Sequence, residues 1–277
     1  MSAPRPPSAG PRGARSRVTP ARDPGAETPP ALSLGEQVAV ITLCRPSRHN
    51  ALGAEDVTRF HEHLDVVDSR AHVRVLVVTG AGNETFCSGA SLGEIERGEL
   101  TPERFATLTD GLAAARVPTV AALNGSVYGG GAEVALSCDF RIGVTGARLL
   151  VPAARLGMCY PVAGQRRFVE RLGLAVAMRI LVAGEELDAD EMVRVGFLTR
   201  AVSPDRLGAA TNELAARLAA AAPLAAAGMK EILRGVAAGA LDPERAEELA
   251  RRCAESRDLR EGLRAKREGD EPSFEGR

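Results

Sequence analysis

Hydrophobic residues follow two different spacings along the first two thirds of the chain. Residues 38–43 (VAVITL) and 73–80 (VRVLVVTG) are short, nearly continuous apolar runs, which are typical of buried strands. Between them, in residues 54–68, apolar side chains recur every three or four positions, at Val57, Phe60, Leu64 and Val67. This is the spacing of one helical face, so the order strand, helix, strand predicts a crossover unit of a parallel sheet.

A second unit of the same kind follows. Thr101 can cap a helix and Pro102 suits its first position, so we predict a helix that continues to Ala115. The next elements are expected to be a strand over 118–123, a helix from about Gly130 after a glycine-rich turn, and a strand over 140–144. Repeated alternation of strands and helices predicts an α/β architecture in which helices cover buried sheets.

The strand pattern stops after about Leu187. Three helices are expected between there and the C-terminus, the first two of them rich in alanine, over 204–221, 223–237 and 242–266. Alanine-rich faces offer little apolar area of their own, so this region is expected to pack on a neighbouring subunit. We therefore divide the folded part into a core over 33–203 and a helical oligomerisation region over 204–277.

Residues 1–32 have a different composition. They are dense in Pro, Gly, Ala and Arg, hold no acidic residue before Asp23 and offer almost nothing apolar to bury. This composition predicts a disordered tail. An arginine-rich, acid-poor start is also typical of a mitochondrial transit peptide, but the prolines would break the amphipathic helix that such a peptide forms. We therefore favour the disordered tail.

Composition narrows the possible partners. The formal net charge of the 277 residues is −1, and no basic cluster beyond the first residues stands free of acids, so we expect no nucleic-acid partner. No apolar run reaches the length of about eighteen residues that a membrane span requires. The five cysteines are scattered and form no CxxC pair, which predicts neither a disulfide framework nor a zinc site and favours a reducing, cytoplasmic location.

The three glycines at 129–131 form the turn into a predicted helix and its first residues. Glycine lets a ligand approach the backbone closely, and a helix start presents free N–H groups at the positive end of its dipole. The segment therefore suits an anion or an oxyanion, although a tight turn or close helix packing explains the same glycines equally well. No Gly-Lys-Ser/Thr and no GxGxxG is present, so phosphate cradling is excluded.

Glu133 follows Gly130 by three positions, so on a helix its carboxylate lies close to the face where the Gly130 N–H emerges. A first-turn glutamate also suits the helix dipole without any catalytic role. A second glycine-bearing stretch, 79–94 (TGAGNETFCSGASLGE), follows a buried strand and can supply another N–H from its SGA. Two N–H donors from different loops beside a carboxylate make an oxyanion hole with an acid/base group.

Several segments together resemble one known family. The stretches ITLCRPSRHNAL, FCSGASLGE and PTVAALNGSVYGGGAEVALSCDFRI are similar to segments of the crotonase (enoyl-CoA hydratase/isomerase) superfamily, and the resemblance runs from about Val38 to Arg277. It implies a crotonase-type spiral of repeated ββα units, a C-terminal helical trimerisation region, and a homotrimer or a hexamer of two trimers. It also implies an acyl-CoA thioester substrate, with coenzyme A as part of that substrate, no further cofactor and no metal.

The same resemblance assigns roles to individual residues. The backbone N–H groups of Ala90 and Gly130 would hold the thioester carbonyl, and Glu133 would be the principal acid/base. Four residues of one stretch would bind the substrate, the last three of them along the thioester and adenine end of the pocket: Ser88, Ser91, Leu92 and Gly93. Arg45 and the backbone around Ala51 would lie near the CoA nucleotide.

The chain departs from the family at one catalytic position. Hydratases of the family use a second glutamate in a Pro-Glu pair, and LLVPAARLGMCYPVAGQRR places Pro152 and Ala153 there. Losing such a group costs about a hundred- to ten-thousandfold in the step that it serves. Three interpretations stay open: an enoyl-CoA hydratase-like enzyme of fatty or carboxylic acid metabolism, a single-base enoyl-CoA isomerase or acyl-CoA decarboxylase, and a non-catalytic acyl-CoA-binding protein.

Other polar residues near these motifs match no catalytic position of the family. We interpret them as packing or rim residues: Glu94, Tyr128, Arg155, Cys159 and Tyr160. The four histidines show no spacing that links them to a serine or cysteine, and no GxSxG is present, which disfavours a serine hydrolase.

Overall fold

The computed structural model describes residues 27–277. The predicted disordered tail lies outside the described residues as far as residue 26. Its predicted boundary at residue 32 is wrong, because Ala31 and Leu32 are ordered in β1 (Ala31–Leu34), which pairs antiparallel with β2 (Val38–Leu43). Such a short strand shows no clear hydrophobic alternation, and its backbone hydrogen bonds to β2 hold it in place.

The main sheet contains the buried strands that the apolar runs predict. Its order is β1-β2-β3-β5-β7-β10, with β3 (Val75–Gly80), β5 (Thr119–Leu123), β7 (Phe140–Val144) and β10 (Arg200–Val202). All neighbouring pairs except β1 and β2 run parallel. Every residue of β2, β3 and β5 is buried, which explains why these strands have no polar face.

A smaller sheet has the order β4-β6-β8-β9, from β4 (Thr85–Cys87), β6 (Ser126–Tyr128), β8 (Arg148–Leu150) and β9 (Leu187–Asp188). Three successive turns of the chain each give one strand to the main sheet, one to the small sheet and then a helix. The helices are α3 (Pro102–Ala114), α4 (Gly130–Ser137) and α5 (Val162–Ala177). This arrangement confirms the predicted spiral of ββα units.

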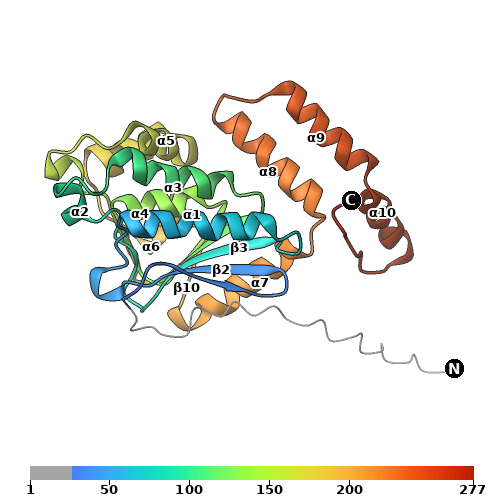
Figure 1. The fold of residues 1–277 in the computed structure, drawn as a ribbon, viewed down its shortest axis with the longest axis horizontal. Coiled ribbons are helices and arrows are strands. Elements are labelled where there is room, and N and C mark those ends of the chain that lie inside the picture. The colour runs from blue at the N-terminus through green and yellow to red at the C-terminus, as the bar shows by residue number, and fades with distance from the viewer. Residues whose placement is uncertain (1–26) are drawn as a thin grey trace.

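Helices cover the main sheet from both sides (Figure 1). On one side α1 (Ala54–Ser69) packs on α3, and α3 packs on α4. On the other side α7 (Leu207–Ala219) contacts β3, β5 and β7 through a buried face. α7 therefore packs on the main sheet, and the predicted division between residues 203 and 204 stays a prediction. The remaining short helical segments are Pro46–Arg48, α2 (Leu92–Glu96), Ala154–Leu156, Met178–Val182, α6 (Ala189–Arg194) and Pro204–Arg206.

Two further predictions about the C-terminal third are wrong. Strands do not stop after Leu187, because β10 extends the main sheet beside β7; its three partly buried residues give no strand pattern in the sequence. The predicted helix over 242–266 is divided into α9 (Pro243–Glu255) and α10 (Arg257–Glu268). Ser256 makes this break, since its hydroxyl accepts a hydrogen bond from the Leu259 N–H at 3.1 Å and so caps α10.

The last three helices, α8 (Pro223–Ala237), α9 and α10, extend away from the core (Figure 1). Asp139, just before β7, anchors α8: its carboxylate lies 2.9 Å from Lys230 Nζ and 2.6 Å from Arg234 Nη2. The same carboxylate accepts the Thr119 N–H at 2.8 Å, so the ion pairs join α8 to β5. Within residues 27–277 no helix is long and apolar enough to cross a bilayer.

Candidate active site

The SGA segment places the Ala90 N–H on the wall of a cavity. Leu52 bridges to Ala90: the Leu52 N–H donates to Gly89 O, and the Ser91 N–H donates to Leu52 O, both at 2.8 Å. In a parallel bridge these bonds use the neighbours of Ala90, so its own N–H points away from Leu52. Gly89 has φ +89°, and a Cβ there would lie 2.4 Å from Gly130 N. Residue 89 must therefore be glycine for the two segments to meet.

The Gly130 N–H faces the same place from the start of α4. Gly129 turns the chain with φ 50° and ψ −126°, and its N–H donates to Leu150 O at 2.9 Å. Gly130 is the first residue of α4, and first-turn N–H groups have no acceptor within their helix. A Cβ on Gly130 would lie 3.3 Å from Ala90 N. Among residues 27–277, neither the Ala90 nor the Gly130 N–H has a hydrogen-bond acceptor.

Glu133 lies one turn along α4 and is 3% exposed. Both of its carboxylate oxygens accept hydrogen bonds from hydroxyl groups: Thr109 Oγ1 donates to Oε1 and Tyr160 Oη donates to Oε2, each at 3.0 Å. Burial raises the pKa of Glu133, while the charge of Arg167 and the two hydroxyl donors oppose that rise. A carboxyl group with a raised pKa is suited to accept and return a proton near neutral pH.

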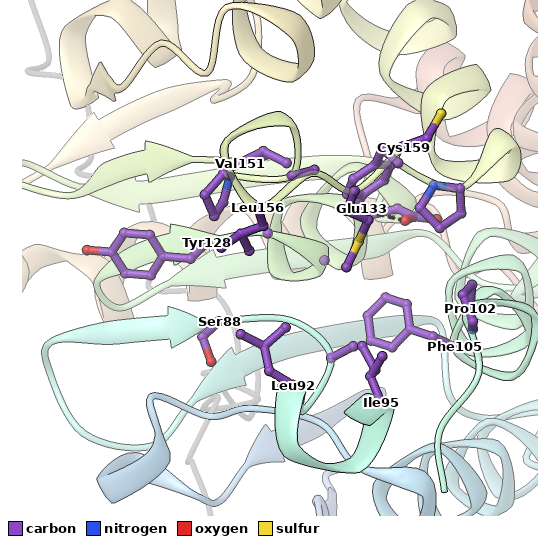
Figure 2. A pocket seen from close by; sticks show the side chains of 18 of the residues that line it. Ser88, Leu92, Ile95, Pro102, Phe105, Tyr128, Glu133, Val151, Leu156 and Cys159 are labelled. Carbon is purple, nitrogen blue, oxygen red and sulfur yellow. Dashed lines mark hydrogen bonds between the residues drawn. The ribbon is translucent and has the colours of Figure 1, made fainter. Parts of the chain in front are cut away.

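These groups share one cavity of about 430 Å³. In Figure 2, Leu92, Ile95 and Phe105 form one side of it, while Val151, Leu156 and Glu133 lie opposite. Most lining side chains are apolar, and Glu133 is the only carboxylate among the lining residues, which include no Lys, Arg or His. Ala153 lines the cavity and is 6% exposed, so no carboxylate reaches it from that position.

The comparisons with known proteins agree with this fold. A family model described as enoyl-CoA hydratase/isomerase matches residues 33–277. The chain belongs to the enoyl-CoA hydratase/isomerase family. As the sequence motifs indicate, this is the crotonase superfamily.

Three relatives illustrate the range of the family. The carnitinyl-CoA dehydratase of Proteus mirabilis is 34% identical over 253 residues, which are 87% of this chain and 95% of the relative. The short-chain-enoyl-CoA hydratase of Clostridium acetobutylicum is 30% identical over 194 residues, 68% of this chain and 74% of the relative. A crystal structure of enoyl-CoA hydratase from Bacillus anthracis has a TM-score of 0.81 at 26% identity, and the match covers 90% of this chain and 100% of that one.

The structure brings five of the nine predicted site residues to the cavity, and their roles there stay predictions. They are Ser88, Ala90, Leu92, Gly130 and Glu133. Ser91 and Gly93 lie at the start of α2 and do not line it. Ser91 follows Ala90 directly, and Gly93 lies three residues after Ala90. Their contact with the adenine end of a CoA substrate does not require a position in the acyl cavity, and it stays a prediction.

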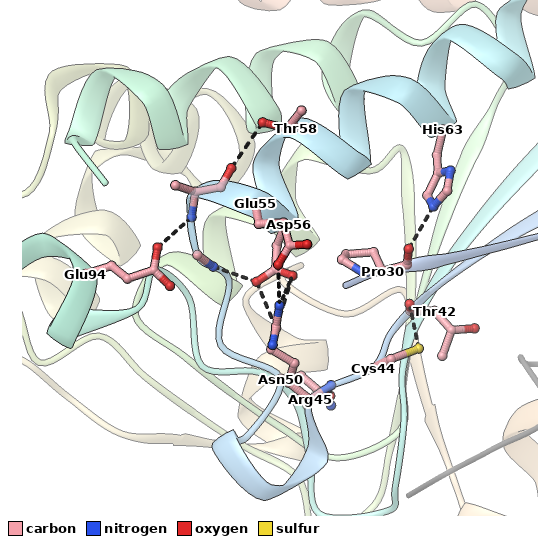
Figure 3. Close-up of polar contacts among 12 residues, drawn as sticks. Pro30, Thr42, Cys44, Arg45, Asn50, Glu55, Asp56, Thr58, His63 and Glu94 are labelled. Carbon is pink, nitrogen blue, oxygen red and sulfur yellow. Dashed lines mark hydrogen bonds and ion pairs between the residues drawn. The ribbon is translucent and has the colours of Figure 1, made fainter. Parts of the chain in front are cut away.

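Arg45 and Ala51, predicted near the CoA nucleotide, also lie outside the cavity wall. The Arg45 guanidinium contacts Asp56 at 3.1 Å and Glu55 at 3.3 Å, as Figure 3 shows. A buried carboxylate such as that of Asp56 requires a partner, so this arginine stabilises the start of α1. The Ala51 N–H donates to Arg48 O at 3.1 Å. The next residue, Leu52, makes the backbone hydrogen bonds to the SGA segment described above. Contact of either residue with CoA stays a prediction.

Glu94 and Arg155, both interpreted as packing or rim residues, hydrogen-bond to the backbone of neighbouring segments. Glu94 Oε2 accepts the Ala54 N–H at 2.7 Å and thereby caps α1 (Figure 3). Arg155 Nη2 donates to Gly184 O at 2.6 Å. Cys159 and Tyr128 line the cavity, and neither is among the hydrogen-bond donors to Glu133 within residues 27–277.

Sequence reasoning missed the two hydroxyl groups that hold Glu133. Thr109 lies on the buried face of α3, between the apolar positions Leu108 and Leu112, and a hydroxyl group on such a face is a usable signal. The sequence motifs indicate a packing or rim role for Tyr160. Its signal is weaker, because its contact with Glu133 depends on the fold rather than on a local pattern.

Metal binding has no visible basis in the described part of the chain. Residues 27–277 contain no group of three or more His, Cys, Asp or Glu side chains that could hold an ion. The absence of a cofactor stays a prediction.

Proposed function

We propose that this chain acts on an acyl-CoA thioester and adds water reversibly across the double bond of a 2-enoyl group. One observation carries the proposal: the Ala90 and Gly130 N–H groups, which have no acceptor among residues 27–277, lie beside Glu133 in one cavity. Two fixed donors at one wall suit an oxygen that gains negative charge during a reaction.

The geometry supports a simple sequence of bond changes. The thioester oxygen accepts hydrogen bonds from Ala90 and Gly130, while Glu133 removes a proton from a water molecule. The water oxygen forms a bond to Cβ, the π electrons of the Cα=Cβ bond form a new double bond between Cα and the carbonyl carbon, and the π electrons of the C=O bond move to the thioester oxygen, giving an enolate. Glu133 then returns the proton to Cα, which yields the 3-hydroxyacyl thioester. Each N–H donor is expected to contribute about a hundred- to a thousandfold in rate.

The lining of the cavity indicates the class of acyl group. The lining side chains are mostly apolar and include no cation, and a carboxylate on the acyl chain would lie near the negative charge of Glu133. We therefore propose an uncharged, apolar acyl group. This argument also disfavours the decarboxylase alternative, whose substrate carries a second carboxylate.

Ala153 favours a second candidate, a double-bond isomerase. A single base suffices there: Glu133 removes a proton from Cα of a 3-enoyl thioester, the electrons pass into the enolate, and the same proton is returned to Cγ. This reaction uses the same two N–H donors and needs no bound water. Its product has the mass of the substrate, whereas hydration adds the mass of one water.

We also propose assembly as a homotrimer or a hexamer of two trimers. Large apolar side chains are exposed on the helices that extend from the core, including Met229 (58%), Leu233 (67%) and Leu263 (59%). Such residues commonly mark an interface between subunits. All five cysteines are free thiols, which is compatible with the proposed cytoplasmic location, and the lack of a nucleic-acid partner stays a prediction.

The test of the function is a substrate panel. Purified protein is incubated with 2-enoyl-CoA and 3-enoyl-CoA thioesters of increasing chain length, with malonyl-type thioesters as charged controls, and the products are analysed by mass. A hydratase should convert 2-enoyl-CoA into a product heavier by one water. An isomerase should convert 3-enoyl-CoA into a product of equal mass with a gain of conjugated enoyl absorbance. Glu133→Gln should lose about a hundred- to ten-thousandfold in turnover with CoA-ester binding retained. Unchanged turnover in this variant would contradict the role of Glu133.

A further inference from the structure

A second polar group reaches the reactive end of the cavity. Tyr160 lies in the segment between β8 and α5 and lines the cavity. Its hydroxyl donates to Glu133 Oε2 at 3.0 Å. It belongs to the same stretch as Ala153, where the resemblance to hydratases leads one to expect a carboxylate and none is present.

The surroundings fix the Tyr160 ring in this position. The ring packs edge-on against Phe168 of α5, with centroids 5.9 Å apart and an interplanar angle of 82°. A Cβ on Gly164 would lie 2.3 Å from Tyr160 Cε1 and 2.6 Å from Glu133 Oε2. Only a glycine at this position leaves room for the phenol and the carboxylate to meet.

The phenol serves as a neutral donor. Burial and the neighbouring charge of Glu133 raise the pKa of Tyr160 well above its ordinary value, so the group keeps its proton at neutral pH. With Thr109 on the other oxygen, the Glu133 carboxylate is held from both sides by hydroxyl groups of two different elements. Its remaining lone pairs are then available to the substrate.

We propose that Tyr160 is a positioning residue, which orients the Glu133 carboxylate and stabilises its charged form in a site without a second carboxylate. The inference rests on the proposed function, because it assigns Tyr160 to the base of that reaction. Tyr160 does not replace the base, since it acts through Glu133.

A dependence on pH follows from this arrangement. The charges that act on Glu133 are those of Arg167 of α5, which lowers its pKa, and Asp110 of α3, which raises it; the two groups form an ion pair at 2.5 Å. Removing the phenol hydroxyl leaves these groups in place but removes one donor to the ionised carboxylate. The pKa of Glu133 should therefore rise, and the acid limb of the pH profile should move to higher pH.

The first test is Tyr160→Phe, assayed with the 2-enoyl-CoA or 3-enoyl-CoA that the wild type converts. The ring and its contact with Phe168 are retained, so the fold should persist. We expect kcat to fall about ten- to a hundredfold, because a hydrogen bond to a charged group is lost, while KM changes less than about threefold. The acid limb of kcat/KM should move upward. Tyr128→Phe is the matched control: Tyr128 lines the cavity, but among residues 27–277 the hydroxyl donors to Glu133 are those of Thr109 and Tyr160, so the acid limb of this variant should coincide with that of the wild type.

A second test reverses the sign of the effect. The chain has two tyrosines, so in the Tyr128→Phe background 3-fluorotyrosine enters at position 160 alone. The fluorinated phenol is more acidic and hence a stronger donor, which should move the acid limb to lower pH. Its fluorine resonance should also titrate with Glu133, and this titration should vanish in Glu133→Gln. This readout needs no turnover, and because the hydroxyl is retained it does not depend on Tyr160→Phe folding.

The outcomes separate the two proposals. Opposite movements of the acid limb in the two proteins support the role of Tyr160. An acid limb that stays in place in both proteins, with no fluorine titration, overturns it even where Glu133→Gln is inactive. Full turnover in Glu133→Gln would instead overturn the proposed base, whatever the behaviour of Tyr160→Phe.

Discussion

The cavity has two walls that supply their polar groups in different ways. One wall offers backbone N–H groups, at Ala90 and Gly130, and the chain there is shaped by glycines with little free space around them. The other wall supplies its polar group from a side chain. Glu133 is held there by the hydroxyl groups of Thr109 and Tyr160, while residue 153 is an alanine.

This difference shows which part of the site can vary. A backbone donor keeps its place as long as the two segments approach each other, which depends on glycine and not on side-chain identity. A side chain can be exchanged without moving the backbone, so an acid can be lost at one position while a hydroxyl group from another contacts the same carboxylate. We therefore expect the backbone wall to tolerate substitution far less than the side-chain wall.

The largest effect is expected from Gly89→Ala. An alanine at φ +89° is strained, and its Cβ would lie 2.4 Å from Gly130 N, so the two donors must separate. We expect kcat/KM to fall by at least about a hundredfold and the free energy of unfolding by about 1–3 kcal/mol. The matched control is Gly98→Ala, which has φ +71° but no atom within 4 Å of the new Cβ. Gly98→Ala should lose stability in the same way but retain its activity. A normal kcat/KM in Gly89→Ala would contradict the claim that Gly89 is needed to hold the Ala90 and Gly130 N–H groups together.

A smaller effect is expected from Ala153→Glu, and here the activity should rise. This change returns a carboxylate to the side-chain wall, where it can bind a water molecule together with Glu133. Hydration of 2-enoyl-CoA should rise about tenfold relative to isomerisation of 3-enoyl-CoA. The like charge should also raise the pKa of Glu133 further and move the acid limb upward. A product ratio equal to that of the wild type would show that the missing carboxylate does not limit hydration.

The smallest effect concerns stability. Burial raises the pKa of Glu133 in the folded protein above the ordinary value of 4.5. The contribution of Glu133 to the free energy of unfolding is therefore fully present below about pH 4.5. This contribution is lost as the pH rises through the raised pKa of the folded state. Gln cannot ionise, so Glu133→Gln should gain stability relative to the wild type over this pH range. Urea unfolding of both proteins between pH 4 and 8 measures the difference, and a difference independent of pH would contradict the raised pKa.

Local patterns in the sequence predict the parts of the fold that depend on local chemistry. β2 coincides with the apolar run at 38–43, and Thr101 caps α3 by accepting the Arg104 N–H at 3.2 Å. β1 and β10 are not predictable in this way, because each is short and depends on its partner in the main sheet. The motifs also lead to Ala90, Gly130 and Glu133, which the structure places in one cavity.

Contacts between distant segments are the part that the sequence does not reveal. Tyr160 and Glu133 meet only because α4 and the segment before α5 come together around Gly164. Arg45 illustrates the converse: its motif points to CoA, and the structure shows its guanidinium beside the buried Asp56. Both outcomes depend on which charged or polar group each side chain meets after folding.

The central claim is that the two N–H donors and Glu133 convert a bound thioester into its enolate. Exchange of the Cα protons of a saturated acyl-CoA in D₂O tests it most directly, because such a substrate can undergo neither hydration nor isomerisation. The account predicts that the wild type introduces deuterium at Cα, seen as a mass increase, and that Glu133→Gln and Gly89→Ala do not. Absence of exchange in the wild type, or equal exchange in Glu133→Gln, would contradict it.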